Sequence, residues 1–427
     1  MQERRFTSSD QRTNSHPALS PELELLLLCA RWPQRRNEDY QLIRTRAIGP
    51  VDWPRFLRLV QHHRLASLVS HTLHASVNEY PSPALQSVLA ELRRLSTQNA
   101  HQSLRLLAEL RRLIQELNSR KIPVRVLKGL PLAQSVFGDL SLRSTGDIDL
   151  LIDESYLLQA DEVLRGFGYA GLFRVDHFSP RRLAFYRAHW KDLAYENPSS
   201  GFQVDLHWRC FRNREMPGSS LCATADSETV CFASFCVETL PTMEGLLYLC
   251  VHGTLDGWIY FKWLVDVAAQ VRAMTVAELD ALAGLASKYG ILPELTATLI
   301  LVRRYLGIDQ WSKRLLPESD PTVIHILRYA DQALEHGGYL GDREAIPISS
   351  TIAFELGLRR NLRYKFELIL RVLFRVRMWE TIPLPDFLFG LYPLLSPFEW
   401  LIYRLRHWRT KPSANVAQEI QSPGKIG

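Results

Sequence analysis

The chain has 427 residues, of which 46% are hydrophobic and 22% are charged, and its formal net charge is +6. This composition is ordinary for a soluble globular protein, and a chain of this length is expected to form two or more domains because a single core rarely exceeds about 250–300 residues. The mild positive excess permits an anionic partner, such as a nucleotide, a nucleic acid or an anionic membrane surface, without requiring one.

The N-terminus and the cysteines indicate a cytoplasmic protein. Residues 1–19 are rich in Ser, Arg, Gln and Asn, so we expect a disordered tail, and they lack the apolar core of a signal peptide. Six cysteines are too few and too irregularly spaced for a disulfide scaffold. Cys231 and Cys236 lie five residues apart without a second pair at zinc spacing, so we predict buried free thiols in a reducing compartment.

Residues 20–120 have the period of helices. Leucines recur at three- and four-residue steps along "PALQSVLAELRRLSTQNAHQSLRLLAELRRLIQELNSRK", with Arg and Glu on the other face. Pro123 ends this pattern. We therefore predict an N-terminal helical domain over residues 20–120.

Short strands and helices alternate in the next segment, residues 121–240. "VRVLKG" predicts a strand and a turn, "LPLAQSVFG" a short helix and "DIDLLID" a second strand. "ESYLLQADEVLRGFGY" predicts a helix, and "GFQVDLHWRC" alternates as a third strand, followed by a loop over residues 211–237. The segment thus predicts a small mixed β-sheet core.

Helical periodicity resumes over residues 241–410, and residues 411–427 are expected to form a second disordered tail. Arg, Pro and Glu interrupt the apolar segments of this region, so none reaches the roughly twenty apolar residues that a membrane-spanning helix needs. The fold class predicted for the whole chain is α+β, with the mixed sheet flanked by N- and C-terminal helical domains.

Two carboxylates stand one residue apart in the second predicted strand. Alternate side chains of a strand share a face, so Asp147 and Asp149 point one way while Ile148 points into the core. Asp205 in the third strand would add a carboxylate, with His207 on the same face. Because close carboxylates repel each other unless a cation joins them, the pattern favours a Mg²⁺ site over a solvated strand edge.

The turn "LKGLP" offers a place for an anion. Gly129 lets the backbone approach a ligand closely, the helix that follows presents free N–H groups, and Lys128 adds a positive charge. A surface lysine at the end of a strand is the alternative interpretation of Lys128.

These residues carry a resemblance to a known family. "VLKGLPLAQSVFGDLSLRSTGDIDLLID", followed by "VDLHW", resembles the bacterial uncharacterised nucleotidyltransferases of the polymerase-beta-like nucleotidyltransferase superfamily. The family pattern is a strand ending in L-K-G, a helix, R-x-x-x-D-[IL]-D-[IL]-L, and a later strand with [DE]-x-H-W. "HGTLDGWIYFKWLVDVA" is similar to the family's helical segment ending in W-L-x-D, so the resemblance extends over about residues 20–400.

The resemblance implies transfer of a nucleotidyl group from a nucleoside triphosphate, with ATP the expected nucleotide. The acceptor would be a hydroxyl or phosphate of a small molecule, sugar, peptide or protein. By this analogy two Mg²⁺ ions are expected: Asp147 and Asp149 bind the one linked to the triphosphate, and Asp205 helps to hold the second and activates the acceptor. The analogy further assigns the β- and γ-phosphates to the Gly129 turn, with Lys128 and Arg143 compensating their charge.

Other residues leave alternatives open. His207 either orients a carboxylate or touches a phosphate, or is a structural hydrogen-bonded histidine. Trp208 is predicted to pack in the core. In "HGTLDGWIYFKWLVD", Lys262 and Asp266 are spaced for a surface ion pair. The functional alternative is a helix that faces the sheet and contributes a stacking aromatic or a polar clamp.

Leu130 stands where the superfamily usually has Ser or Gly after the phosphate turn. This favours one alternative function, a catalytically inactive nucleotide-binding regulator. A second alternative is a membrane-peripheral interaction module, since the apolar segment 366–408 is flanked by arginines. No stable nucleic-acid partner is expected.

Overall fold

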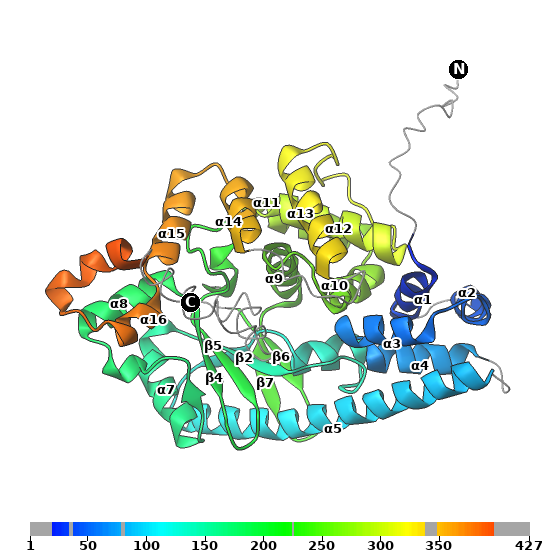
Figure 1. Cartoon of the computed structure of the whole chain (residues 1–427), viewed down its shortest axis with the longest axis horizontal. Helices are drawn as coiled ribbons and strands as arrows, with labels where there is room; N and C mark the ends of the chain where they lie inside the picture. Colours follow the sequence, from blue (N-terminus) through cyan, green and yellow to red (C-terminus); the bar gives the residue numbers. More distant parts are fainter. Residues whose placement is uncertain (1–18, 34–36, 78–81, 224–225, 338–347, 397–427) are drawn as a thin grey trace, which may run out of the picture.

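The computed structural model describes residues 19–33, 37–77, 82–223, 226–337 and 348–396. The predicted tails, residues 1–19 and 411–427, lie outside these ranges except for Leu19, as does the end of the apolar segment 366–408. Helices surround a small mixed sheet (Figure 1), so the predicted α+β class is confirmed.

Five helices precede the sheet: α1 (Pro21–Cys29), α2 (Asn37–Ile48), α3 (Trp53–His62), α4 (Ala66–Ser76) and α5 (Pro83–Ser119). The 37-residue helix α5 matches the long leucine pattern. Ser82 caps its start by accepting a hydrogen bond from Leu85 N, and proline occupies its first turn. In Figure 1, α5 extends beneath both the sheet and helices α3 and α4.

The five-stranded sheet has the order β1-β2-β5-β4-β3. Its strands are β1 (Val124–Val126), β2 (Asp147–Ile152), β3 (Ala170–Gly171), β4 (Asp192–Glu196) and β5 (Gln203–His207). Strands β2 and β5 pair in parallel, and the other neighbours pair antiparallel. The strands expected at residues 124–129, 147–153 and 201–210 are therefore present, at the centre and one edge of the sheet.

Short helices connect these strands: α6 (Leu130–Leu132), the π-helix η1 (Ala133–Phe137), η2 (Glu154–Tyr156), α7 (Leu157–Gly166), η3 (Val175–His177) and α8 (Pro180–His189). The segment expected to be a loop instead contains η4 (Ser219–Ala223) and most of a hairpin, β6 (Glu228–Cys231) and β7 (Cys236–Thr239). Thr239 Oγ1 donates a hydrogen bond to Val126 O at 2.7 Å, which fastens this hairpin to the edge strand β1.

The C-terminal helices are α9 (Thr242–Leu255), α10 (Phe261–Ala273), α11 (Val276–Lys288), α12 (Leu292–Leu306), α13 (Pro321–Gly337), α14 (Ile348–Leu358), α15 (Leu362–Leu373), α16 (Val376–Thr381) and η5 (Asp386–Leu391). Helices α1–α4 share one hydrophobic core with α9–α14. The predicted division into domains at residues 120 and 240 stays a prediction.

The two faces of the sheet meet different cores. Ile148 and Leu150 of β2 and Leu206 of β5 pack with α5 and α7. Leu151, on the opposite face of β2, belongs to the core of the surrounding helices. Asp147, Asp149 and Leu151 share a face because their positions differ by two, so the carboxylates point toward the layer that contains α9 and α10.

Candidate active site

The parallel pairing of β2 and β5 brings three polar side chains together. Asp149 is the register partner of Asp205, and His207 lies two residues farther along β5. Each of the three residues offers a ligand atom within 4.8 Å of the others. Asp205 therefore lies beside Asp149.

Asp149 is 2% exposed and is surrounded by donors on one side only. Its Oδ1 lies 3.4 Å from Lys128 Nζ and 3.2 Å from His207 Nε2. Its Oδ2 is buried and has no hydrogen-bond partner in the described part of the chain. Burial opposes ionisation of Asp149, but the charge of Lys128 and the hydrogen bond from His207 hold its pKa below the usual value. An ionised carboxylate with an unpartnered buried oxygen is a fit ligand for a divalent cation.

Asp205 has the opposite electrostatic environment. Burial, followed by the neighbouring carboxylates of Asp149, Asp192 and Asp147, raises the pKa of Asp205 to about 8. Burial opposes the charge of Lys128, but the carboxylates of Asp149, Asp147 and Asp205 hold its pKa well above the ordinary value. Asp147 is half-buried and precedes Asp149 on the same face of β2. The cluster therefore carries more negative charge than Lys128 neutralises, which favours binding of a cation.

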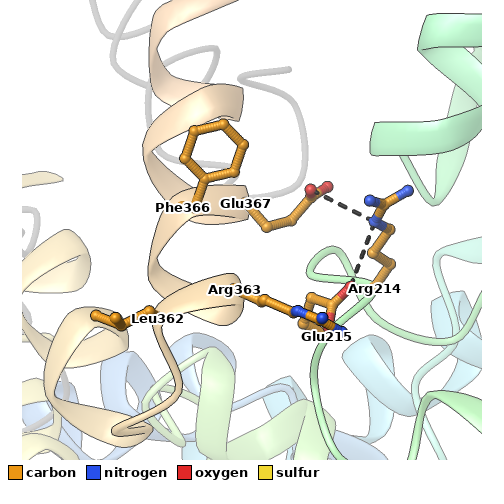
Figure 2. A pocket seen from close by; sticks show the side chains of 6 residues that line it. All are labelled: Arg214, Glu215, Leu362, Arg363, Phe366 and Glu367. Atoms are coloured by element: carbon orange, nitrogen blue, oxygen red, sulfur yellow. Dashed lines mark ion pairs between the residues drawn. The ribbon is translucent and has the colours of Figure 1, made fainter.

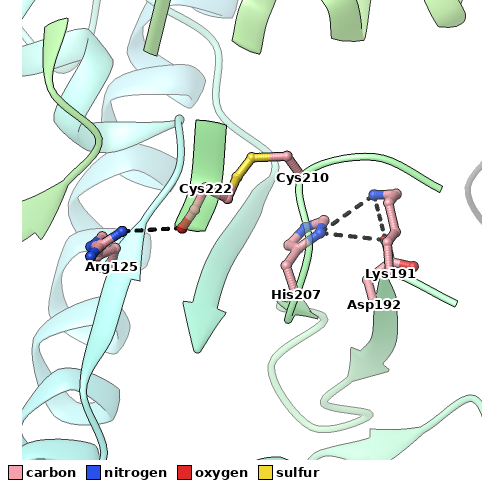
Figure 3. Close-up of a disulfide and its surroundings, with 6 residues drawn as sticks. All are labelled: Arg125, Lys191, Asp192, His207, Cys210 and Cys222. Carbon is pink, nitrogen blue, oxygen red and sulfur yellow. Dashed lines mark hydrogen bonds and ion pairs between the residues drawn. A yellow bond between two sulfur atoms is a disulfide. The ribbon is translucent and has the colours of Figure 1, made fainter. Parts of the chain in front are cut away.

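His207 is held by two residues that the sequence did not single out. Lys191 Nζ lies 3.4 Å from His207 Nδ1 and 2.6 Å from Asp192 Oδ2 (Figure 3). Burial, together with the charge of Lys191, lowers the pKa of His207. In the neutral ring, Nδ1 accepts from Lys191 while Nε2–H donates to Asp149.

Arg143 faces inward and is fully engaged. It is 5% exposed, and its Nε and Nη2 donate to the two carboxylate oxygens of Asp266 on α10, each at 2.8 Å. Its Nη1 donates to Thr145 Oγ1 at 3.1 Å and to Gly129 O at 3.4 Å. These bonds join the turn at Gly129, the loop before β2 and helix α10.

Both the backbone conformation and the packing at position 129 require a glycine. Its φ of 79° lies in the left-handed region. A Cβ at this position would also lie 3.2 Å from Thr145 Cγ2. Gly129 and Leu130 are both buried, so Leu130 packs in the core behind the turn.

Helix α10 contacts the loop that leads into β2, and the ion pair that its spacing suggested is absent from the described residues. Asp266 and Lys262 are 1% and 7% exposed, so a surface pair is wrong, and Asp266 binds Arg143 instead. Trp263 is half-buried, with its ring centroid 5.2 Å from that of His252 on α9. Trp208 is buried as predicted, and its Nε1 donates to Arg187 O at 3.1 Å.

Four of the six cysteines are paired, which corrects the prediction of free thiols. Cys210 and Cys222 form a disulfide near His207 (Figure 3), with a Cα–Cα distance of 5.7 Å. Cys231 and Cys236 are register partners across the β6–β7 hairpin, and their Cα atoms lie 4.0 Å apart. Strand pairing thus brought together residues that the spacing alone left unmatched. Cys29 and Cys250 are free and buried.

Comparison with known proteins gives a family match. The family model described as "Uncharacterised nucleotidyltransferase" matches residues 49–307, which include α3, the whole sheet and α10. No curated protein and no solved structure matches the chain. Since the family model covers more than half of the sequence and every residue of the carboxylate cluster, the chain belongs to the family of uncharacterised nucleotidyltransferases.

Proposed function

We propose that the chain is a Mg²⁺-dependent nucleotidyltransferase that moves a nucleoside monophosphate group from a nucleoside triphosphate, ATP foremost, to a hydroxyl or phosphate acceptor. The family match supports nucleotidyltransferase activity in general. The observation that carries the finer proposal is the convergence of Asp149 and Asp205 beside an unpartnered oxygen of Asp149.

The transfer exchanges one P–O bond for another. An acceptor oxygen attacks the α-phosphorus, a new P–O bond forms, the bond to the oxygen bridging to the β-phosphate breaks, and pyrophosphate leaves. Asp205 would take the acceptor's proton, and Asp147 and Asp149 would hold the Mg²⁺ ion. Bound Mg²⁺ would neutralise the charge that develops on the phosphate oxygens.

The neighbouring residues hold these acids in place. His207 orients Asp149 through its 3.2 Å contact, and Lys191 fixes the tautomer of His207. Lys128 balances charge at Asp149 and remains our candidate for contact with a phosphate. Arg143 fixes the loop that leads into β2, and Gly129 shapes the turn beneath it.

The direct test uses nucleoside triphosphates labelled at the α-phosphate, incubated with Mg²⁺, the protein and fractions of a cell lysate as the source of acceptor. We expect labelled product and pyrophosphate with at least one nucleotide and fraction, and neither with the Asp149→Asn variant as blank. Calorimetric binding of the nucleotide without label transfer above the blank in any fraction contradicts the proposal. That result would favour the inactive nucleotide-binding regulator, which the presence of Leu130 in place of the usual Ser or Gly also favours.

A second candidate function rests on the surface of α15. Leu362, Phe366 and Ile369 follow one another at helical spacing and are 80%, 65% and 48% exposed. Figure 2 shows Leu362 and Phe366 at a hollow that Arg363 and Arg214 also line. Exposed apolar side chains beside Arg363 suit peripheral contact with an anionic membrane, whereas Arg214 is paired with Glu215 and Glu367.

Vesicle sedimentation tests this second candidate. Binding to phosphatidylserine vesicles that is lost in a Leu362→Ser, Phe366→Ser double variant would support it, and an equal distribution of both proteins would contradict it. Within the described residues, no helix combines the length and apolarity needed to cross a bilayer.

A further inference from the structure

Two cations outside the carboxylate cluster lack an anionic partner. Lys262 on α10 is 7% exposed, and its Nζ donates to Ser144 O at 3.3 Å. Arg64 lies between α3 and α4, is exposed, and places its guanidinium over the ring of Tyr260 at 4.8 Å. In the described part of the chain, neither side chain forms an ion pair with a carboxylate.

Both cations border the loop that leads into β2. Ser144, the partner of Lys262, is two residues before Gly146, which is exposed. A Cβ on Gly146 would lie 4.0 Å from Arg64 Nη1. The exposed backbone of this loop therefore borders two cations: Lys262 of α10, and Arg64 of the turn between α3 and α4.

The backbone of Arg64 is strained in a way that places it there. Its φ of 57° is in the left-handed region, which costs a non-glycine residue on the order of 1 kcal/mol or more. Arg64 N donates to Gln61 O at 3.1 Å, which turns the chain sharply after α3. Leu65 N also donates to Val60 O at 3.0 Å, so Arg64 occupies the left-handed position that commonly ends a helix.

The charges around Lys262 do not balance. Asp266 is already paired with Arg143, so its carboxylate does not form an ion pair with Lys262. Burial, followed by the charges of Arg143 and Arg64, lowers the pKa of Lys262 to about 7, while Asp147 and Asp266 oppose this. A bound anion would supply the missing negative charge.

The cations lie close to the carboxylate cluster. Gly146 is three residues before Asp149, a span of at most about 10 Å along an extended strand. Asp147 lies between Gly146 and Asp149 in the sequence, and its charge acts on the pKa of both Lys262 and Asp205. An anion at Arg64 and Lys262 is therefore within reach of a substrate held at Asp149 and Asp205.

We infer that Arg64 and Lys262 bind the β- and γ-phosphates of the nucleoside triphosphate along the loop 144–146. The inference rests on the proposed function and names two residues of that site which the sequence did not assign to phosphate. Arg64 supplies a planar fork for two phosphate oxygens, and Lys262 a compact charge. Because Leu130 is buried behind the turn, these cations from the surrounding helices take over the contact that a serine there would make.

The experiment is calorimetric titration with inorganic tripolyphosphate in EDTA. We expect saturable binding by the wild type, weakened about tenfold or more by Arg64→Ala and by Lys262→Met, which is about 1.4 kcal/mol for each tenfold. Arg58→Ala is the matched control, since Arg58 is an exposed arginine of α3. Equal affinities for the wild type, Arg64→Ala and Lys262→Met, or no binding by the wild type, would overturn the inference.

Two further arms separate this inference from the proposed function. Circular dichroism checks the fold of each variant, and the exposed Arg64 keeps the test decisive if Lys262→Met unfolds. Asp205→Asn should still bind tripolyphosphate in EDTA. If tripolyphosphate binding depends on Arg64 but no nucleotidyl transfer is found, the anion site is supported and the proposed function is contradicted.

Discussion

Asp149 lies directly opposite Asp205 on the parallel strands β2 and β5, and the pKa values of these two acids are shifted in opposite directions. Asp149 has Lys128 and His207 as partners, whereas Asp205 faces mainly other acids. In the metal-free protein, Asp149 therefore holds a negative charge at neutral pH and Asp205 holds a proton.

Substitution of these two acids should affect stability differently. In EDTA at neutral pH, Asp205→Asn should melt no lower than the wild type, because the wild type must take up a proton on Asp205 to fold and the variant need not. Asp149→Asn should be destabilised by on the order of 3 kcal/mol, because Lys128 loses its partner in a buried place. Calorimetric unfolding checks both, and a drop for Asp205→Asn as large as that for Asp149→Asn would mean that Asp205 is structural.

Stability without metal should fall as the pH rises, through Asp205. Its folded pKa of about 8 lies above the ordinary value of 3.8, so between these values the folded state keeps a proton that the unfolded state has lost. The melting temperature of the wild type relative to Asp205→Asn should therefore fall from pH 5 to pH 8. The rise in melting temperature that Mg²⁺ gives should be larger at pH 8 than at pH 6. A pH-independent difference between the two proteins would contradict the assignment.

The bidentate pair of Arg143 and Asp266 should be mainly structural. Arg143→Met should cost about 3–5 kcal/mol of unfolding free energy, because Asp266 is left as an unpaired buried charge. The double variant Arg143→Met, Asp266→Leu should recover much of this loss. A double-mutant cycle in urea measures the coupling. If Arg143→Met unfolds like the wild type but loses tripolyphosphate affinity, Arg143 contacts phosphate instead.

Binding of tripolyphosphate should weaken in the wild type above about pH 7, relative to Lys262→Arg. The pKa of Lys262 is about 7 in the free protein, so its charge is lost as the pH rises through that value, whereas arginine remains charged. Tripolyphosphate itself titrates in this range, but it does so equally for both proteins. The ratio of the dissociation constants of the wild type and Lys262→Arg is therefore free of this effect. A ratio that stays constant from pH 6 to pH 9 would show that Lys262 does not meet the anion.

Much of the carboxylate cluster could be predicted from local pattern. Asp147 and Asp149 share a face by alternation, and so do Asp205 and His207. The register that sets Asp149 beside Asp205 comes from pairing between strands whose partners are 56 residues apart in sequence, and only the family resemblance suggested it.

Strand β4 was missed although its signal is present. "DLAYE" alternates, with Leu193 and Tyr195 buried, but it is short and follows a helix. The omission also hid Lys191 and Asp192, which hold His207. In "FCVET" the same alternation marks β7, and its pairing with β6 closes the Cys231–Cys236 bond.

Arg64 and the partner of Arg143 had no local signal. Arg64 follows an amphipathic helix and looks like any solvated arginine, and only tertiary packing brings it to Gly146. Arg143 and Asp266 are 123 residues apart in sequence. The nearer spacing of Lys262 and Asp266 on one helix suggested the wrong pair, because burial of α10 against the loop offered Asp266 a better, bidentate partner.

Titration with Mn²⁺, followed by its paramagnetic resonance signal, tests most directly whether Asp147, Asp149 and Asp205 form a metal site that His207 orients. The wild type should bind Mn²⁺ saturably, and Mg²⁺ should compete. His207→Gln should weaken the affinity by about 10–100-fold. Asp205→Asn should lose the binding while remaining folded. Equal Mn²⁺ affinity of the wild type and Asp205→Asn would contradict the account.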